Sequence, residues 1–279
     1  MGRLVRTFIF GNLWIACCAV AMCIETNLLL HVPLNFPSFY LFVFCATLAQ
    51  YNLHYLLKKK ANRDSKRFTW SQRNKQVHLV FTLFGLAGVL LTLPLLEVRH
   101  FYVLVAVACL SLLYSCPVLP IGKKRLKEYG LLKILILSLN WTIVSVWLPI
   151  DVSGVNPSIY WLVFVRRFLF LFVLCLLFDI RDVESDSSEG IGTIPVRWGI
   201  GRAYWLADVL LTLFVLCTIV HCLIERDLLV LAAMILSALA TKGIMNYSKK
   251  HHSDYVYLAG IDGMMLLQAG LVLVAMAIS

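Results

Sequence analysis

Three aspartates stand at the end of a long apolar run, where a helix of membrane length would meet water. Asp179, Asp182 and Asp186 directly follow the apolar residues 159–178. On a helix these positions share one face, so their carboxylates repel one another unless a cation holds them. Mg²⁺ binds oxygen and usually takes one or two protein carboxylates, completing its shell with water and substrate phosphates. The spacing therefore predicts half of a magnesium–diphosphate site. The alternative is a solvated charged loop.

The composition indicates a polytopic membrane protein. Hydrophobic residues make up 61% of the 279 residues and charged residues 14%, and the mean hydropathy is +0.84, so one soluble core could not hide the apolar surface. Windows of about 20 apolar residues, the length that crosses a bilayer, fall near 7–31, 38–57, 75–97, 99–120, 131–150, 159–178, 203–223, 227–247 and 255–278. We predict an all-α bundle of nine transmembrane helices that forms a single domain, residues 1–279.

Lysine and arginine predict the orientation, because short loops rich in them stay in the cytoplasm. The N-terminus and alternate loops hold 19 of the 25, whereas the opposite loops hold only Arg99 and Arg226. We therefore expect a multi-pass protein of the cell or inner membrane, with a cytoplasmic N-terminus and the aspartates on the cytoplasmic face. The net charge of +10 is explained by this topology and by anionic headgroups, so no nucleic-acid partner is expected.

Ionisable groups inside the predicted spans are costly and need a role. Asp262 could orient a lysine or arginine of a pocket or act as a base toward an acceptor; a structural ion pair is the alternative. Lys133 and Asn140 share a helix face and line either a cavity or a packing contact. For Arg166 and Arg167 we expect snorkelling or a buried structural pair.

Residues 179–199, DIRDVESDSSEGIGTIPVRWG, resemble the second aspartate motif of the UbiA-type intramembrane prenyltransferases, which runs approximately D-x-x-D-x-x-x-D and then G-x-K-T-L/I-P. Gly192 stands where that motif has its lysine. The resemblance implies that two acid motifs bind Mg²⁺, which grips the diphosphate of an isoprenoid substrate. It further implies that a carbocation forms in an aromatic-lined cavity and is captured by an acceptor. Aspartates 179, 182 and 186 would then be the metal ligands and catalytic residues.

The first family motif, N-D/x-x-x-D-x-x-x-D, falls on residues 52–60. Asn52 matches it, but Leu56 and Lys60 replace the two aspartates, so one metal site is in question. Lys60, with Lys58, could neutralise diphosphate oxygens directly as a point charge; an anchor in the headgroups is the alternative. Further candidate contacts with the substrate are Lys124, Arg125 and the ring of Tyr55.

The resemblance implies a prenyltransferase that moves an isoprenoid chain from a prenyl diphosphate to a lipophilic acceptor in the membrane, with Mg²⁺ as cofactor. An intramembrane terpene cyclase would need the same site. A different class is a non-catalytic protein that keeps the fold for lipid binding or as a scaffold. A transporter is a weaker alternative, because we find neither a broken helix pair nor a charge network in the middle of the membrane.

Overall fold

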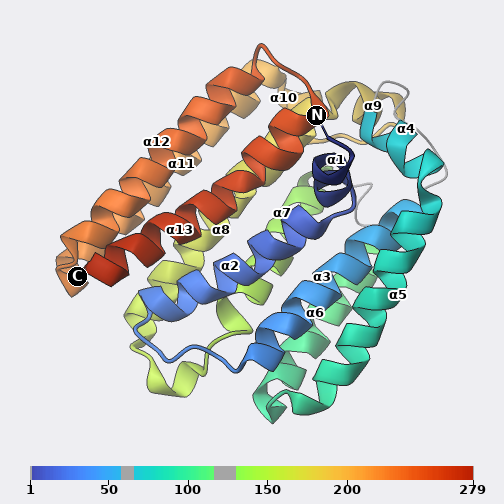
Figure 1. The fold of residues 1–279 in the computed structure, drawn as a ribbon. Helices are drawn as coiled ribbons and strands as arrows, with labels where there is room; N and C mark the ends of the chain where they lie inside the picture. Colours follow the sequence, from blue (N-terminus) through green and yellow to red (C-terminus); the bar gives the residue numbers. More distant parts are fainter. Residues whose placement is uncertain (1, 58–65, 116–129, 279) are drawn as a thin grey trace.

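The computed structural model describes residues 2–57, 66–115 and 130–278, and within these residues the chain is helical, without strands (Figure 1). The long helices have the apolar composition that the sequence windows indicated. The α-helices are α1 (Arg3–Phe10), α2 (Leu13–Leu29), α3 (Pro37–Leu57), α4 (Lys66–Arg73), α5 (Lys75–Thr92), α6 (Val98–Ser115), α7 (Gly130–Thr142), α8 (Pro157–Arg181), α9 (Val183–Ser188), α10 (Ile194–Trp198), α11 (Ile200–Glu225), α12 (Leu228–Ser248) and α13 (Gly263–Ile278).

Shorter helical turns interrupt or join these helices. The 3₁₀ turns are η1 (Leu93–Leu95) and η4 (Val152–Gly154), and the π turns are η3 (Ile143–Trp147) after α7 and η5 (Val256–Ile261) before α13. Each π turn carries the wider hydrogen bond that defines it, from the N–H of Leu148 to the carbonyl of Ile143 and from Asp262 to Tyr257. Such turns hold one residue more than the α-helix around them.

Six helical segments of the described chain are long and apolar enough to cross a membrane, and a seventh forms if α1 and α2 count as one span. The helix α3 and the shorter apolar stretch Val98–Ser111 fall on two further predicted windows without meeting both criteria. The all-helical membrane fold is therefore confirmed, but the count of nine spans is not.

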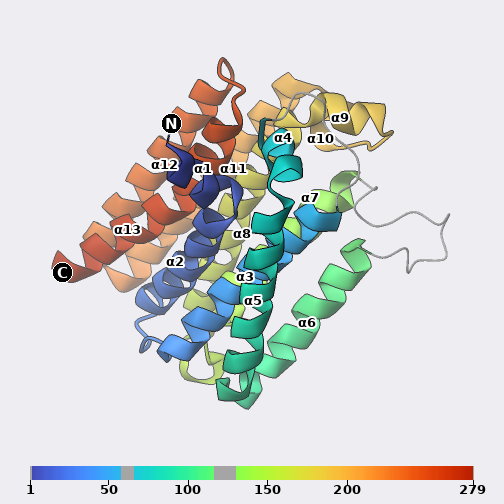
Figure 2. The same ribbon diagram turned by 45° about the vertical axis from the view of Figure 1, so that its right-hand side comes forward.

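The helices α1 and α2 are bent by 57° relative to each other. The bend lies at Asn12, which has a left-handed backbone (φ 66°) and is fully buried. Asparagine tolerates this conformation better than most residues. The bend turns α1 away from the axis of α2 and keeps it at the end of the bundle where α4, α9 and α10 lie (Figures 1 and 2).

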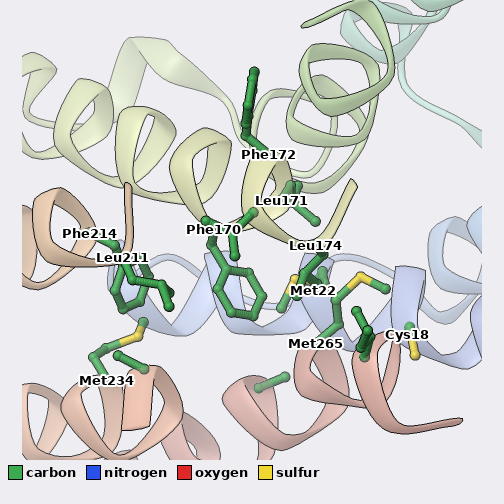
Figure 3. Close-up of a cluster of buried hydrophobic side chains, with 14 of the residues drawn as sticks. Cys18, Met22, Phe170, Leu171, Phe172, Leu174, Leu211, Phe214, Met234 and Met265 are labelled. Atoms are coloured by element: carbon green, nitrogen blue, oxygen red, sulfur yellow. The ribbon is translucent and has the colours of Figure 1, made fainter. Parts of the chain in front are cut away.

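The helix α8 is the central element of the bundle. Its first turn is fixed by Pro157 and by Asn156, whose side-chain oxygen accepts a hydrogen bond from the N–H of Ser158 at 3.0 Å, a normal helix start. It packs against α7 and α11, and 56% of its membrane window is buried, compared with 22% for the window in α5. Figure 3 shows the core it helps to form, in which Phe170 of α8 faces Phe214 of α11.

The pair α3 and α5 is held together by close backbone approach. A Cβ added at Gly85 would lie 2.7 Å from the carbonyl oxygen of Cys45 and 2.8 Å from the nitrogen of Ala49. Small residues at helix interfaces permit such contact in membranes, where packing rather than the hydrophobic effect holds helices together. This pair carries Asn52 and Tyr55 toward the end of the bundle that contains α9.

An ion pair lies deep within the bundle, near the middle of α8. The guanidinium of Arg167 is 3.1 Å from the carboxylate of Glu25, with side-chain exposures of 2% and 0%, and Arg166 Nη1 lies 3.0 Å from Nδ1 of His221. The expected buried pairing of the arginines is therefore confirmed. The expectation of no charge network in the middle of the membrane is wrong, because these buried charged groups meet near the middle of α8. The expectation of no broken helix pair is also wrong, because α1 and α2 pass as one apolar span only with a bend between them.

Candidate functional site

The helix α8 ends within the predicted aspartate cluster. Asp179 lies in its last turn, Asp182 caps it with φ −91° and ψ 10°, and Asp186 belongs to the separate short helix α9. The three residues therefore do not stand on one continuous helix, and that part of the sequence argument is wrong. The backbone stays close to helical through the break, since the N–H of Asp186 donates to the carbonyl of Asp182 at 2.8 Å.

Lys133 of α7 joins two of the three aspartates. Its ammonium lies 3.0 Å from Oδ1 of Asp179 and 3.0 Å from Oδ2 of Asp186, and 3.3 Å from the other oxygen of Asp186. Both carboxylates are buried, with side-chain exposures of 7% and 10%, and the lysine side chain is 19% exposed. Charge-assisted hydrogen bonds of this kind are among the stronger ones in proteins. The two aspartates that meet are thus the first and the third.

A glycine brings Lys133 to this position. Gly130 opens α7 one turn before the lysine, and it packs directly on the backbone of Gly192 and Thr193 in the loop after α9; a Cβ on Gly130 would overlap that backbone. Gly130 therefore lets α7 approach the acid loop. The side of Gly192 that would carry a Cβ faces the guanidinium of Arg197. A lysine at position 192 would therefore displace Arg197.

Asp182 has a different partner. Arg181 holds its carboxylate with two hydrogen bonds, Nε to Oδ1 at 2.8 Å and Nη2 to Oδ2 at 2.9 Å, and the guanidinium lies over the rings of Phe178 and Tyr257 at 4.8 and 5.3 Å. A bidentate, stacked arginine is well ordered. Asp182 is about a third exposed, so its carboxylate is the most accessible of the three.

The electrostatics of this cluster are close to balanced, with three carboxylates facing the two cations Lys133 and Arg181. Burial raises the pKa of Asp186 above its ordinary value, and the nearby Lys133 ammonium opposes that rise. One oxygen, Oδ2 of Asp179, is buried and has no hydrogen-bond partner among the residues that the structure describes. A buried acceptor in this state is a group that a cation or a donor would satisfy.

The donor set fits a hard divalent cation in part. Asp179 and Asp186 supply carboxylate oxygens that already converge on one cation, and no described residue donates to Oδ2 of Asp179. Mg²⁺ needs no more than one or two carboxylates when phosphate oxygens complete its shell. Within the described parts of the chain, no group of three or more His, Cys, Asp or Glu side chains could hold a metal. The residues therefore fit a site that a diphosphate must complete.

Asn52, the one residue of the first motif that matches, lies in a buried hydrogen-bond network. Its amide nitrogen donates to the carbonyls of Gly11 and Leu48, at 3.0 and 2.8 Å. Its amide oxygen accepts from Nδ2 of Asn12 at 3.2 Å and lies 2.6 Å from Nδ1 of His78. The side chain is fully buried and its hydrogen-bonding groups are engaged. This network ties α3 to the bend between α1 and α2 and to α5.

Tyr55 and Asp262 lie near the same end of the bundle, around Arg67 of α4. The guanidinium of Arg67 is 4.3 Å from the centre of the Tyr55 ring and donates to Asn12, while its backbone N–H donates to Asp254 at 2.8 Å. Asp262 directly follows η5 and interacts electrostatically with Arg67 and Arg181. The residue as a whole is half-buried.

Four of the candidate cations are outside the described residues. These are Lys58 and Lys60 after α3, and Lys124 and Arg125 before α7. Their roles stay predictions. The cations that the structure brings to the acid cluster are Lys133 and Arg181. The sequence offered one signal for the first of these, a lone lysine within an apolar span. For Arg181 there was none, because an arginine at a helix end is common.

Comparisons with known proteins agree with the sequence motif. The UbiA prenyltransferase family matches residues 71–256. No curated protein sequence matches the chain significantly.

Solved structures are similar over nearly the whole chain. The match to a structure of digeranylgeranylglyceryl phosphate synthase covers 100% of this chain and 98% of the synthase chain, with a TM-score of 0.58 at 15% identity. A UbiA homologue from Archaeoglobus fulgidus bound to GPP and Mg²⁺ covers 98% and 99%, with a TM-score of 0.65 at 13% identity. The apo form of a homologue from Aeropyrum pernix K1 gives 0.62 at 15% identity over the same shares. The structural likeness concerns the fold, and the family match extends over about two thirds of the sequence. The chain is therefore a multi-pass membrane protein that belongs to the UbiA prenyltransferase family.

Proposed function

We propose that this protein transfers an isoprenoid chain from a prenyl diphosphate to a lipophilic acceptor within the membrane. The observation that carries the proposal is the convergence of Asp179 and Asp186, buried at the end of α8, on a single cation. Two carboxylates that share one cation, with an oxygen of Asp179 that no described residue satisfies, suit a site for Mg²⁺ and diphosphate. The similar structure bound to GPP and Mg²⁺ supports the same substrate class.

Asp179 and Asp186 would hold the metal, and Asp182, the third predicted ligand, could join them only by leaving Arg181. Bound Mg²⁺ would neutralise the charge that develops on the leaving diphosphate as the allylic C–O bond breaks. Lys133 is placed to bind diphosphate oxygens next to these acids. The predicted contacts of Lys60, Lys58, Lys124 and Arg125 with the diphosphate are part of the proposal, as is a cytoplasmic position of the site.

The remaining residues suit the hydrocarbon part of the reaction. Tyr55 presents an aromatic ring at the end of the bundle that contains the acids, and aromatic rings stabilise cations through their quadrupole. Asp262 is our candidate for a base toward the acceptor, since it is half-buried at this end of the bundle and interacts electrostatically with Arg67 and Arg181. Asn52 supports the proposal only indirectly, as an anchor of α3.

A non-catalytic membrane protein of the same fold is the second candidate. Two observations favour it: Lys133 and Arg181 already neutralise the aspartates, and the hydrogen-bonding groups of Asn52 are engaged within the bundle. Such a protein would bind lipid or a partner without cleaving a diphosphate. A terpene cyclase would use the same acid site and would release diphosphate without an added acceptor.

Diphosphate release from the purified protein separates these possibilities. Wild type should release diphosphate from geranyl, farnesyl or geranylgeranyl diphosphate when Mg²⁺ and a panel of lipophilic acceptors are present, whereas a cyclase would do so with the acceptors left out. Asp179→Asn and Asp186→Asn should each lower the rate by at least about 100-fold, the order of effect expected when charge stabilisation of the leaving group is lost. Asp208→Asn is the matched control, because this aspartate pairs with Lys242 on an exposed face. Equal rates in wild type and both site variants would end the catalytic proposal.

A further inference from the structure

The ammonium of Lys133 occupies the place between two carboxylates that a divalent cation would use. It is 3.0 Å from an oxygen of each carboxylate, whereas Mg²⁺ binds oxygen at about 2.0–2.1 Å. A metal that took an oxygen from each carboxylate would therefore compete with the ammonium for the same two groups. The metal and the ammonium would also repel each other strongly, because the site between the two buried carboxylates is poorly solvated.

We propose that Lys133 is a resident counter-cation that excludes a divalent cation from Asp179 and Asp186 until the diphosphate of a substrate receives its ammonium. This inference rests on the proposed function, because it takes the two aspartates as the metal-binding pair. It predicts the order of events: the metal binds together with the anionic substrate and not before it.

The surroundings leave the ammonium few alternatives in the absence of an anion. Asp182 is already held by two hydrogen bonds from Arg181, so it does not compete for the lysine. Asp179 and Asp186 are both largely buried, and two buried carboxylates without a cation would be unstable. Lys133 therefore stabilises the acid loop when no metal is bound.

A diphosphate changes this balance because it offers new acceptors for the lysine. The lysine side chain is a flexible stem that carries a compact charge with three donors, and it is partly exposed. When its ammonium moves to phosphate oxygens, the two carboxylates need another cation, and Mg²⁺ can then bind both the acids and the diphosphate. Arg181 could move to phosphate oxygens only by giving up its bidentate pair with Asp182.

The test measures thermal stability of the detergent-purified protein against Mg²⁺ alone, with choline chloride of equal ionic strength as the reference. Wild type should respond little. Lys133→Met should be stabilised by Mg²⁺ without any diphosphate, with an apparent affinity at least about ten-fold tighter than that of wild type, because the metal no longer displaces two charged hydrogen bonds. Lys242→Met is the matched control: it removes a lysine from another Lys–Asp pair, with Asp208, and should respond as wild type does.

The double variant Lys133→Met/Asp186→Asn locates the metal. It lacks both the cation and one acid, so it should fold without metal and lose the response to Mg²⁺. A response that persists in the double variant would place the metal elsewhere and overturn the inference. Equal responses of wild type and Lys133→Met, whether both strong or both absent, would also overturn it. If Lys133→Met does not fold even when Mg²⁺ is present in all purification buffers, the metal cannot replace the ammonium, and the inference is again wrong.

Failure of the inference and failure of the proposed function are distinguishable. If Mg²⁺ stabilises Lys133→Met but wild type releases no diphosphate, the counter-cation role of Lys133 is supported and the catalytic proposal is wrong. If wild type releases diphosphate but Mg²⁺ affects the stability of wild type and Lys133→Met equally, the catalytic proposal is supported and the counter-cation role is wrong. The stability readout needs no substrate, so the test of the counter-cation does not depend on choosing the correct acceptor.

Discussion

The buried pair of Glu25 and Arg167 gives the sharpest prediction about stability. Its atoms are 3.1 Å apart, and neither side chain is more than 2% exposed. Glu25→Gln keeps the shape of the side chain and removes its charge, which leaves Arg167 buried without a carboxylate. Arg166 lies near enough to interact electrostatically with Glu25 as well, so the change affects two buried cations.

The magnitude follows from distance and burial. At 3.1 Å the attraction of two unit charges is about 5 kcal/mol with an effective dielectric constant of about 20, and the cost of removing both charges from water offsets much of it. Removal of one partner forfeits the attraction but keeps the cost for the other, so Glu25→Gln should lower the free energy of unfolding by about 3–5 kcal/mol. The double variant Glu25→Gln/Arg167→Met removes both charges and should recover at least about 2 kcal/mol of that loss.

The free energy of unfolding can be measured by titration with sodium dodecyl sulfate in mixed micelles. The matched control is Glu97→Gln, because Glu97 pairs with Arg99 at the shorter distance of 2.7 Å but with side-chain exposures of 54% and 28%. That exposed pair should contribute at most about 1 kcal/mol. If the two single variants cost the same, burial does not determine the strength of these pairs and the reasoning is refuted.

Two further predictions concern topology and packing. Single cysteines in place of Ser187 and Ser253 should react with an impermeant thiol reagent from the cytoplasmic side, because both positions lie at the acid-cluster end of the bundle. A cysteine in place of Ser153 should react only from the other side. Labelling of positions 187 and 153 from the same side would contradict this arrangement. Gly85→Ala should destabilise the protein by about 1–3 kcal/mol, since the added Cβ meets the backbone of α3 at less than 3 Å. Gly243→Ala in α12, where a Cβ meets nothing within 4 Å, should instead be stabilising by about 0.5–1 kcal/mol; a loss at both positions would argue against the specific contact.

Much of the fold could be predicted from local sequence, because a bilayer demands long apolar helices. The predicted windows overlap helices throughout the described chain, and the acid cluster lies at the end of α8 as expected. The number of spans was less predictable. The helix α3 has the required length, but polar residues near its end lower its hydropathy, and one of them, Asn52, is buried against other helices.

The partners within the site could not be predicted, since they depend on contacts between helices distant in the sequence. Spacing alone suggested that Asp179, Asp182 and Asp186 act together, but Asp182 stands at a helix break and pairs with Arg181, whereas Lys133 joins the other two. Lys133, 46 positions before Asp179 in the numbering, reaches the acids because Gly130 lets α7 touch the loop after α9. The sequence around Glu25 likewise does not indicate that Arg167 is its partner.

The π turn η5 limits how the chain can change in length. Its wider turn ends in the hydrogen bond from Asp262 to Tyr257, and deletion of one residue there would restore ordinary α-helical spacing. Residues before the deletion would then rotate by about 100° relative to α13. Asp254 would turn away from the backbone N–H of Arg67, which it now binds at 2.8 Å. A relative that is one residue shorter in this turn must therefore fasten α4 to the bundle by a different contact.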